Sequence, residues 1–137
     1  MKRLRFALVF VIAALAGCVR SVPMPEAFPE TLGGWHRTGA VRDVPSSQAA
    51  DALPAKNVEQ IRAASYDGPG KLEARVYALS SSAVALDVVQ RWTPRADTVF
   101  FYRDRFFVVV QWQTADKKAL QAFMSALEKR FTAGQPV

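Results

Sequence analysis

Cysteine and histidine are almost absent from this chain of 137 residues, which has one of each. A single cysteine excludes an intramolecular disulfide, so the fold must be stabilised by packing. His36 has no cysteine, histidine or carboxylate near it at the usual ligand spacing, and no local partner that would orient it as a general base. We therefore expect no metal site and no catalytic role for His36.

Motifs for catalysis and for cofactor binding are also missing. The serines Ser80, Ser81 and Ser82 do not lie in a Gly-x-Ser-x-Gly elbow, and they are better explained as helix caps. The turn DGPG at 67–70 lacks the Lys-Ser/Thr pair of a phosphate-binding loop. The acidic residues are dispersed near the ends of expected elements, where turns and caps account for them. We expect no cofactor.

Basic residues form no stripe or long run in residues 18–137. The formal net charge is +6, but three basic residues lie in the first five positions, and residues 18–137 carry 15 basic and 12 acidic residues, a net charge of +3. A nucleic-acid surface needs a basic stripe with aromatic residues interleaved. We therefore expect no nucleic-acid partner.

Long apolar runs are absent, except for a short one near the amino end. The run FALVFVIAALA at 6–16 has eleven residues, whereas a membrane-spanning helix needs roughly 20. It follows Lys2, Arg3 and Arg5 and ends at Gly17 and Cys18. This order is typical of a cleaved export signal. A short anchor helix followed by an incidental cysteine is the alternative.

The end of this run, Leu15-Ala16-Gly17-Cys18, resembles the lipobox of bacterial lipoproteins. The resemblance implies that the Cys18 thiol receives a diacylglycerol, that the signal peptide 1–17 is removed, and that the new amino group is acylated, for example with palmitate. Two or more acyl chains anchor a protein stably, whereas one does not. Because Val19 stands where an aspartate would favour the inner membrane, the resemblance implies the outer membrane, facing the periplasm, in a didermic host.

The 120 residues from 18 to 137 are enough for one domain. Two prolines in VRSVPMPEA favour extended backbone, so we expect a tether over 18–27. Phe28, Leu32 and Trp35 then indicate packed structure. A single α+β domain is predicted over 28–137.

Within this domain, two strand pairs alternate with two helices. IRAASY and KLEARVYAL are predicted to pair around 67–70, and TVFFY and RFFVVVQW around Arg103 and Asp104. Two apolar stripes at helical spacing predict the helices: Ala85, Val88, Val89 and Trp92, and then Leu120, Phe123, Met124, Leu127 and Phe131. The β-branched residues of the first stripe leave a strand as the alternative there. The order hairpin, helix, hairpin, helix predicts a four-stranded, mostly antiparallel sheet with both helices on one face.

Three segments of the domain resemble a family of exported bacterial proteins of unknown function. They are FPETLGGW, RVYALSSSAVAL and FFYRDRFFVVV, and the resemblance extends over 28–131. The family supplies no catalytic residues to carry over. Its longer members have a larger glycine-rich segment where 38–60 is short in this chain.

The second predicted hairpin has apolar side chains on both of its faces, although a sheet covered on one side should be polar on the other. Two explanations remain open. Either the segment 28–44 or the region of Leu53 folds over the second face, or this face is an apolar site for a lipid-like ligand or a partner protein. The residues of that candidate site are Phe100, Phe101, Phe107 and Val109.

The sequence therefore favours a non-catalytic, lipid-anchored protein of the bacterial cell envelope that binds or supports a partner protein at the membrane. The second hypothesis is a small carrier of an apolar ligand that uses the second sheet face, and a hydrolase is the third. A carrier predicts a cavity of several hundred Å³ lined by Phe and Trp. A partner-binding protein predicts a flat or filled face, and an enzyme predicts convergent polar groups.

Overall fold

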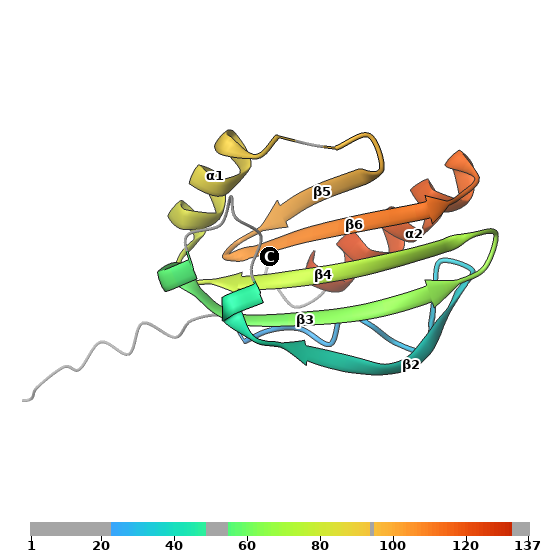
Figure 1. The fold of residues 1–137 in the computed structure, drawn as a ribbon, viewed down its shortest axis with the longest axis horizontal. Coiled ribbons are helices and arrows are strands. Elements are labelled where there is room, and N and C mark those ends of the chain that lie inside the picture. The colour runs from blue at the N-terminus through green and yellow to red at the C-terminus, as the bar shows by residue number, and fades with distance from the viewer. Residues whose placement is uncertain (1–22, 49–54, 94, 133–137) are drawn as a thin grey trace, which may run out of the picture.

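The computed structural model describes residues 23–48, 55–93 and 95–132. The expected signal peptide and Cys18 lie outside these residues. In the described part, six strands form one antiparallel sheet that curls into a half-barrel, in the order β1-β2-β3-β4-β6-β5 (Figure 1). The elements are β1 (Thr31–Leu32), β2 (Trp35–Val44), β3 (Val58–Asp67), β4 (Lys71–Leu79), α1 (Ser82–Arg91), β5 (Thr98–Arg103), β6 (Phe106–Thr114) and α2 (Lys117–Thr132).

The predicted four-stranded sheet is therefore wrong, because β1 and β2 extend it beyond β3. β2 pairs antiparallel with β3, from His36 opposite Asp67 to Val44 opposite Ile61. Among the ten residues of β2, only Trp35 is buried, so the strand lacks the apolar alternation that indicates a strand in a sequence. A register shift, with Gly39 at φ +76° inside it, interrupts the pattern further.

The prediction that both helices share one face is also wrong. The buried side chains of α2 belong to one hydrophobic cluster and those of α1 to a second one on the other side of the sheet. Figure 1 shows α2 behind the sheet and α1 at the end where β5 and β6 join. The physical reason lies in β6, where Phe106 and Val108 point to the α2 side while Phe107 points to the α1 side, so both faces need a cover.

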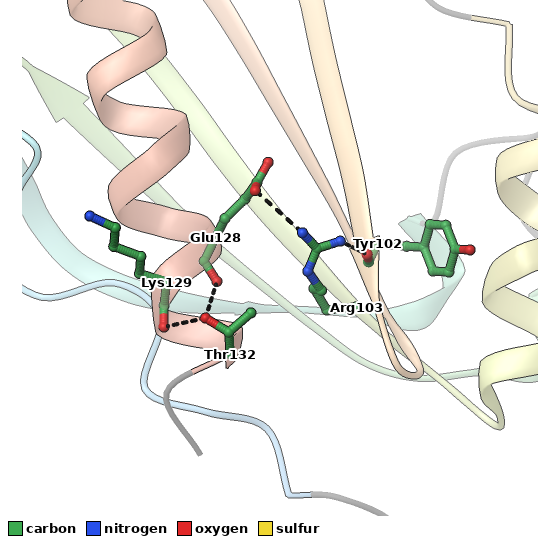
Figure 2. A network of polar contacts seen from close by, with 5 residues as sticks. All are labelled: Tyr102, Arg103, Glu128, Lys129 and Thr132. Carbon is green, nitrogen blue, oxygen red and sulfur yellow. Dashed lines mark hydrogen bonds and ion pairs between the residues drawn. The ribbon is translucent and has the colours of Figure 1, made fainter. Parts of the chain in front are cut away.

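Two consecutive residues of β5 also point to opposite faces of the sheet. Arg103 points toward α2 and places its Nη2 atom 3.4 Å from Glu128 Oε2 (Figure 2). The ring of Tyr102 points the other way, toward α1, and packs against the second cluster. In the last turn of α2, the Thr132 hydroxyl donates to the carbonyl oxygens of Glu128 and Lys129.

The main core lies between the sheet and α2. Phe123 is fully buried and contacts the rings of Trp35 and Tyr66. The Trp35 indole nitrogen also donates to the carbonyl oxygen of Ala119, 3.0 Å away, which joins the start of β2 to α2. The predicted helical stripe is confirmed, since Leu120, Phe123, Leu127 and Phe131 are the buried residues of α2.

The chain packs against this core from Met24 onward, which is earlier than the predicted start of the domain at Phe28. Met24 is partly buried, and Ala27 and Phe28 are buried in the core. We call residues 24–29 the N-terminal strap. Three side chains hold its carbonyl oxygens: Arg130 donates to Glu26, Arg37 donates to Phe28, and Tyr66 donates to Pro29.

The positions of the N-terminal strap and β2 bear on the expectation that 28–44 folds over the second face of the sheet. Phe28, Leu32 and Trp35 cover the α2 side of the sheet, and only Val44 at the end of β2 packs against the cluster on the second face. Leu53 lies outside the described residues. Burial raises the pKa of Tyr66 to about 12, so its phenol stays protonated and keeps donating to the strap even at a pH where an exposed tyrosine ionises.

The turn between β3 and β4 leaves no room for a side chain at Gly70. An added Cβ would lie 1.7 Å from the carbonyl oxygen of Thr114 and 3.0 Å from the Cα of Ala115. We expect Gly70→Ala to lower the free energy of unfolding by about 1–3 kcal/mol, because the two backbones must move apart. Urea denaturation measures this, with the exposed Lys71→Ala as the control. Equal midpoints for both variants would contradict the close approach.

Candidate functional site

The sheet face that carries α1 is apolar at one end. Phe107 is fully buried there, with ring centroids 5.1 Å from Trp92 and 5.9 Å from Phe100. Ala85 and Val88 of α1 are buried against the same cluster. The helix therefore fills this end of the second face.

The four residues of the predicted apolar site do not form one open surface. Phe100, Phe107 and Val109 lie on the second face, as the alternation of β5 and β6 requires. Phe101 lies on the opposite face, where its ring centroid is 5.7 Å from that of Phe131. Of the three on the second face, Phe107 is covered completely, and Phe100 and Val109 are partly buried.

Beside this covered end, a hollow of about 470 Å³ opens between the end of α1, the segment that follows it, and strands β4 and β6. We call it the arginine hollow. Its lining includes Glu73, Arg75, Tyr77, Arg91, Trp92, Arg95 and Val109.

The position of α1 determines where Arg91 and Trp92 lie. The helix starts at Ser82 because the Ser81 hydroxyl accepts a hydrogen bond from the backbone N–H of Val84, at 3.2 Å. This confirms the predicted capping role of the serine run. The helix ends at Arg91, so Arg91 and Trp92 stand at its carboxyl end, over the sheet.

Arg75 on the floor of the hollow is paired with Glu73. Arg75 Nε lies 2.7 Å from Glu73 Oε1, and Arg42 lies 3.4 Å from the other carboxylate oxygen. Burial on its own would raise the pKa of Glu73, but the hydrogen bonds and charges of Arg75 and Arg42 together lower that pKa below its usual value. Glu73 is therefore ionised at neutral pH and is shared between two arginines.

The other two arginines leave the hollow with excess positive charge. Arg91 forms an exposed ion pair with Asp87, at 3.1 Å, of a kind that contributes little to stability. Arg95 makes no salt bridge to any residue that the structure describes. With three arginines and Glu73 in the lining, the formal charge there is +2.

Trp92 contributes a buried donor without an acceptor. Its indole Nε1 is inaccessible to solvent and has no hydrogen-bond partner within the described part of the chain. A buried N–H group that lacks a partner costs about 1–3 kcal/mol. Such unmet buried donors are few in native proteins, so Trp92 is an exception in this fold.

The chemistry of the arginine hollow suits the binding of an anion. Guanidinium groups bind carboxylates and phosphates through paired N–H donors, and the partly exposed Trp92 adds apolar surface beside them. Among the described residues that line it, no nucleophile is paired with a general base. His36 is exposed on β2, opposite Asp67, and Ser81 caps α1. Within the described ranges, no group of three or more His, Cys, Asp or Glu residues is placed to hold a metal ion.

A second concave feature lies on the α2 side of the sheet. This apolar groove has a volume of about 660 Å³ and runs between α2 and strands β5 and β6. Val99, Trp112, Leu120 and Met124 supply its apolar lining. The predicted apolar stripe of α2 includes Met124, which the core does not fully bury. This extra apolar residue is the sequence feature that indicates the groove.

Sequence reasoning did not find the arginine hollow. Arg75 lies on β4, Arg91 ends α1, and Arg95 belongs to the segment before β5, so no motif links them. In β4, Arg75 is one of the polar residues that alternate with apolar ones, which indicates only an exposed face.

No protein-family model, curated protein or solved structure matches the chain. Among the helices that the structure describes, none is long and apolar enough to cross a membrane. Function is therefore inferred from the hollow, the groove and the amino-terminal sequence.

Proposed function

We propose that this protein is a non-catalytic, lipid-anchored protein of the bacterial cell envelope that binds a partner protein in the arginine hollow. An acylated Cys18 holds it in the membrane, on the periplasmic side of the outer membrane in a didermic host. The partner presents an acidic segment with an apolar or planar side chain. The acylated protein binds this partner while it is held at the membrane surface.

The observation that carries the binding proposal is the lining of the hollow. A volume of about 470 Å³ falls within the range of ordinary ligand sites. An incoming carboxylate would meet the positive charge of Arg95, with Arg91 beside it in its exposed ion pair with Asp87. Arg and Trp are also the side chains that most often dominate protein interfaces.

The anchor proposal is supported by the amino-terminal sequence and by the start of the packed chain. The charged start, the short apolar run and Leu15-Ala16-Gly17-Cys18 are all in the order of a lipoprotein precursor. Packing begins at Met24, so few residues separate the modified cysteine from the domain.

The binding proposal predicts that charge reversal at Arg95 releases the partner. We expect Arg95→Glu to lower the yield of the cross-linked partner at least about tenfold, because the new carboxylate repels an acidic segment. The measurement is affinity capture of the native, lipidated protein from cross-linked membranes, with quantitative mass spectrometry. Lys56→Glu makes the same charge change at an exposed site outside the hollow and should leave the yield unchanged.

Equal recovery of the partner by Arg95→Glu and by the unchanged protein would exclude the hollow as the binding site. If no protein is captured at all, the result favours the second function, a carrier of an apolar ligand. The groove between α2 and β5 supports that alternative through Val99, Trp112 and Met124. Native mass spectrometry of the purified protein would then reveal a bound lipid-like molecule. A hydrolase has no observation in its favour among the described residues.

A further inference from the structure

The N-terminal strap limits how far the domain can stand from the anchor. Cys18 and Met24 are six residues apart, so the chain between them spans at most about 20 Å when fully extended. The strap itself is fixed to the domain, because Arg130 donates two hydrogen bonds, at 3.0 and 2.5 Å, to the carbonyl oxygen of Glu26. When Cys18 is anchored, this short connection therefore keeps the domain next to the membrane, and the end of α2 lies close to the point of attachment.

The exposed surface of α2 carries the excess positive charge of the protein. Lys117 and Lys118 are exposed at its start, and Lys129 and Arg130 at its end. Against these four basic residues the helix has one acidic residue, Glu128, which gives it a net charge of +3. This equals the net charge of residues 18–137, so the residues of that segment outside α2 include equal numbers of basic and acidic side chains.

The spacing of these charges suits a flat surface. The two basic pairs are about 18 Å apart along the helix axis, at 1.5 Å per residue. The exposed residues between them, Gln121, Ala122 and Ser125, carry no charge. At about 100° per residue, Lys118 and Lys129 share the outer face of the helix with Ser125, whereas Lys117 lines the apolar groove and Arg130 turns toward Glu26 of the strap. A helix that lies along a surface of anionic lipid headgroups would place Lys118 and Lys129 against it.

The arginine hollow lies on the other side of the sheet. The strap and α2 contribute to one hydrophobic cluster, whereas Tyr77, Trp92 and Val109 of the hollow belong to the cluster on the α1 side. The sheet separates the two surfaces. A domain that rests on α2 therefore turns its hollow away from the lipid.

We propose that the outer face of α2 contacts the anionic lipid headgroups of the membrane that holds the anchor, and that the arginine hollow faces the aqueous compartment. This inference rests on the lipid anchor proposed above. It assigns a lipid-contacting surface to α2. It also requires the partner to approach from solution or from a facing structure, and not from within the same leaflet.

The test uses the natively lipidated protein in vesicles that contain phosphatidylglycerol. Because the acylated Cys18 has no free thiol, a cysteine introduced elsewhere is labelled specifically. Ser125→Cys places a fluorophore on the exposed face of α2, and Thr93→Cys places one on the rim of the hollow. Lipids with spin-labelled headgroups should quench the label at 125 at least about fivefold more than the label at 93.

A charge variant provides the matched control. Lys118→Gln combined with Lys129→Gln should abolish most of the difference, as should vesicles of phosphatidylcholine alone, since both remove the attraction between α2 and the headgroups. Equal quenching at 125 and 93, or stronger quenching at 93, on vesicles that carry the protein would overturn the orientation and leave the anchor intact. Failure of the protein to float with the vesicles would overturn the anchor and this inference together.

Discussion

Replacement of Phe123 by alanine should lower the free energy of unfolding by about 3–5 kcal/mol, as truncation of a large aromatic side chain in a core does. Phe123 is fully buried on α2. Its ring centroid lies 5.0 Å from that of Tyr66 and 6.0 Å from that of Trp35, both in edge-on geometry. These rings come from three elements that are far apart in the chain, so the cavity would weaken the contact of α2 with β2 and β3 together.

Urea denaturation of the domain measures the effect. Gln121→Ala serves as the control, because Gln121 is exposed on the same helix and its removal should change stability by less than about 0.5 kcal/mol. Equal midpoints for the two variants would show that α2 does not pack through the row that contains Phe123.

Replacement of Cys18 by serine should abolish acylation completely. The lipobox resemblance requires a thiol as the nucleophile that accepts the diacylglycerol, and a serine hydroxyl is a much weaker nucleophile at neutral pH. The protein would then remain as an uncleaved precursor or appear in a soluble form. Metabolic labelling of cells with an alkyne fatty acid, followed by fluorescence detection in a gel, measures the acylation.

The neighbouring variant Val19→Asp is a matched control for this experiment. By the same resemblance it should keep the label but shift the protein toward the inner membrane, because the thiol is retained and only the sorting residue changes. If Cys18→Ser carries as much label as the unchanged protein, the lipid-anchor proposal fails, and the orientation inferred for α2 fails with it.

The local elements of this fold were predictable because each carries its own periodicity. Alternating side chains with a DGPG turn predicted β3 and β4, and the apolar row from Leu120 to Phe131 predicted α2. The start of α1 followed from the serines, since a hydroxyl at Ser81 satisfies a free backbone N–H at the first turn. These are interactions between residues close in the sequence.

The sheet edge and the placement of the helices were not predictable in this way. β2 joins the sheet through backbone hydrogen bonds to β3, which depend little on side chains, and its exposed residues carry no apolar alternation. The apolar residues on both faces of β6 did signal that both faces need a cover. They did not show that α1 provides the second one, because a helix with one apolar stripe fits either face.

The sequence by itself determined the local elements, and it carries the motif on which the proposed lipid anchor rests. Only the tertiary structure decided that α1 and α2 lie on opposite faces and that Arg75, Arg91 and Arg95 line one hollow with Trp92. The reason is physical. Periodicity and capping act over a few residues, whereas the sides of a curled sheet and the side chains gathered there depend on how distant segments pack.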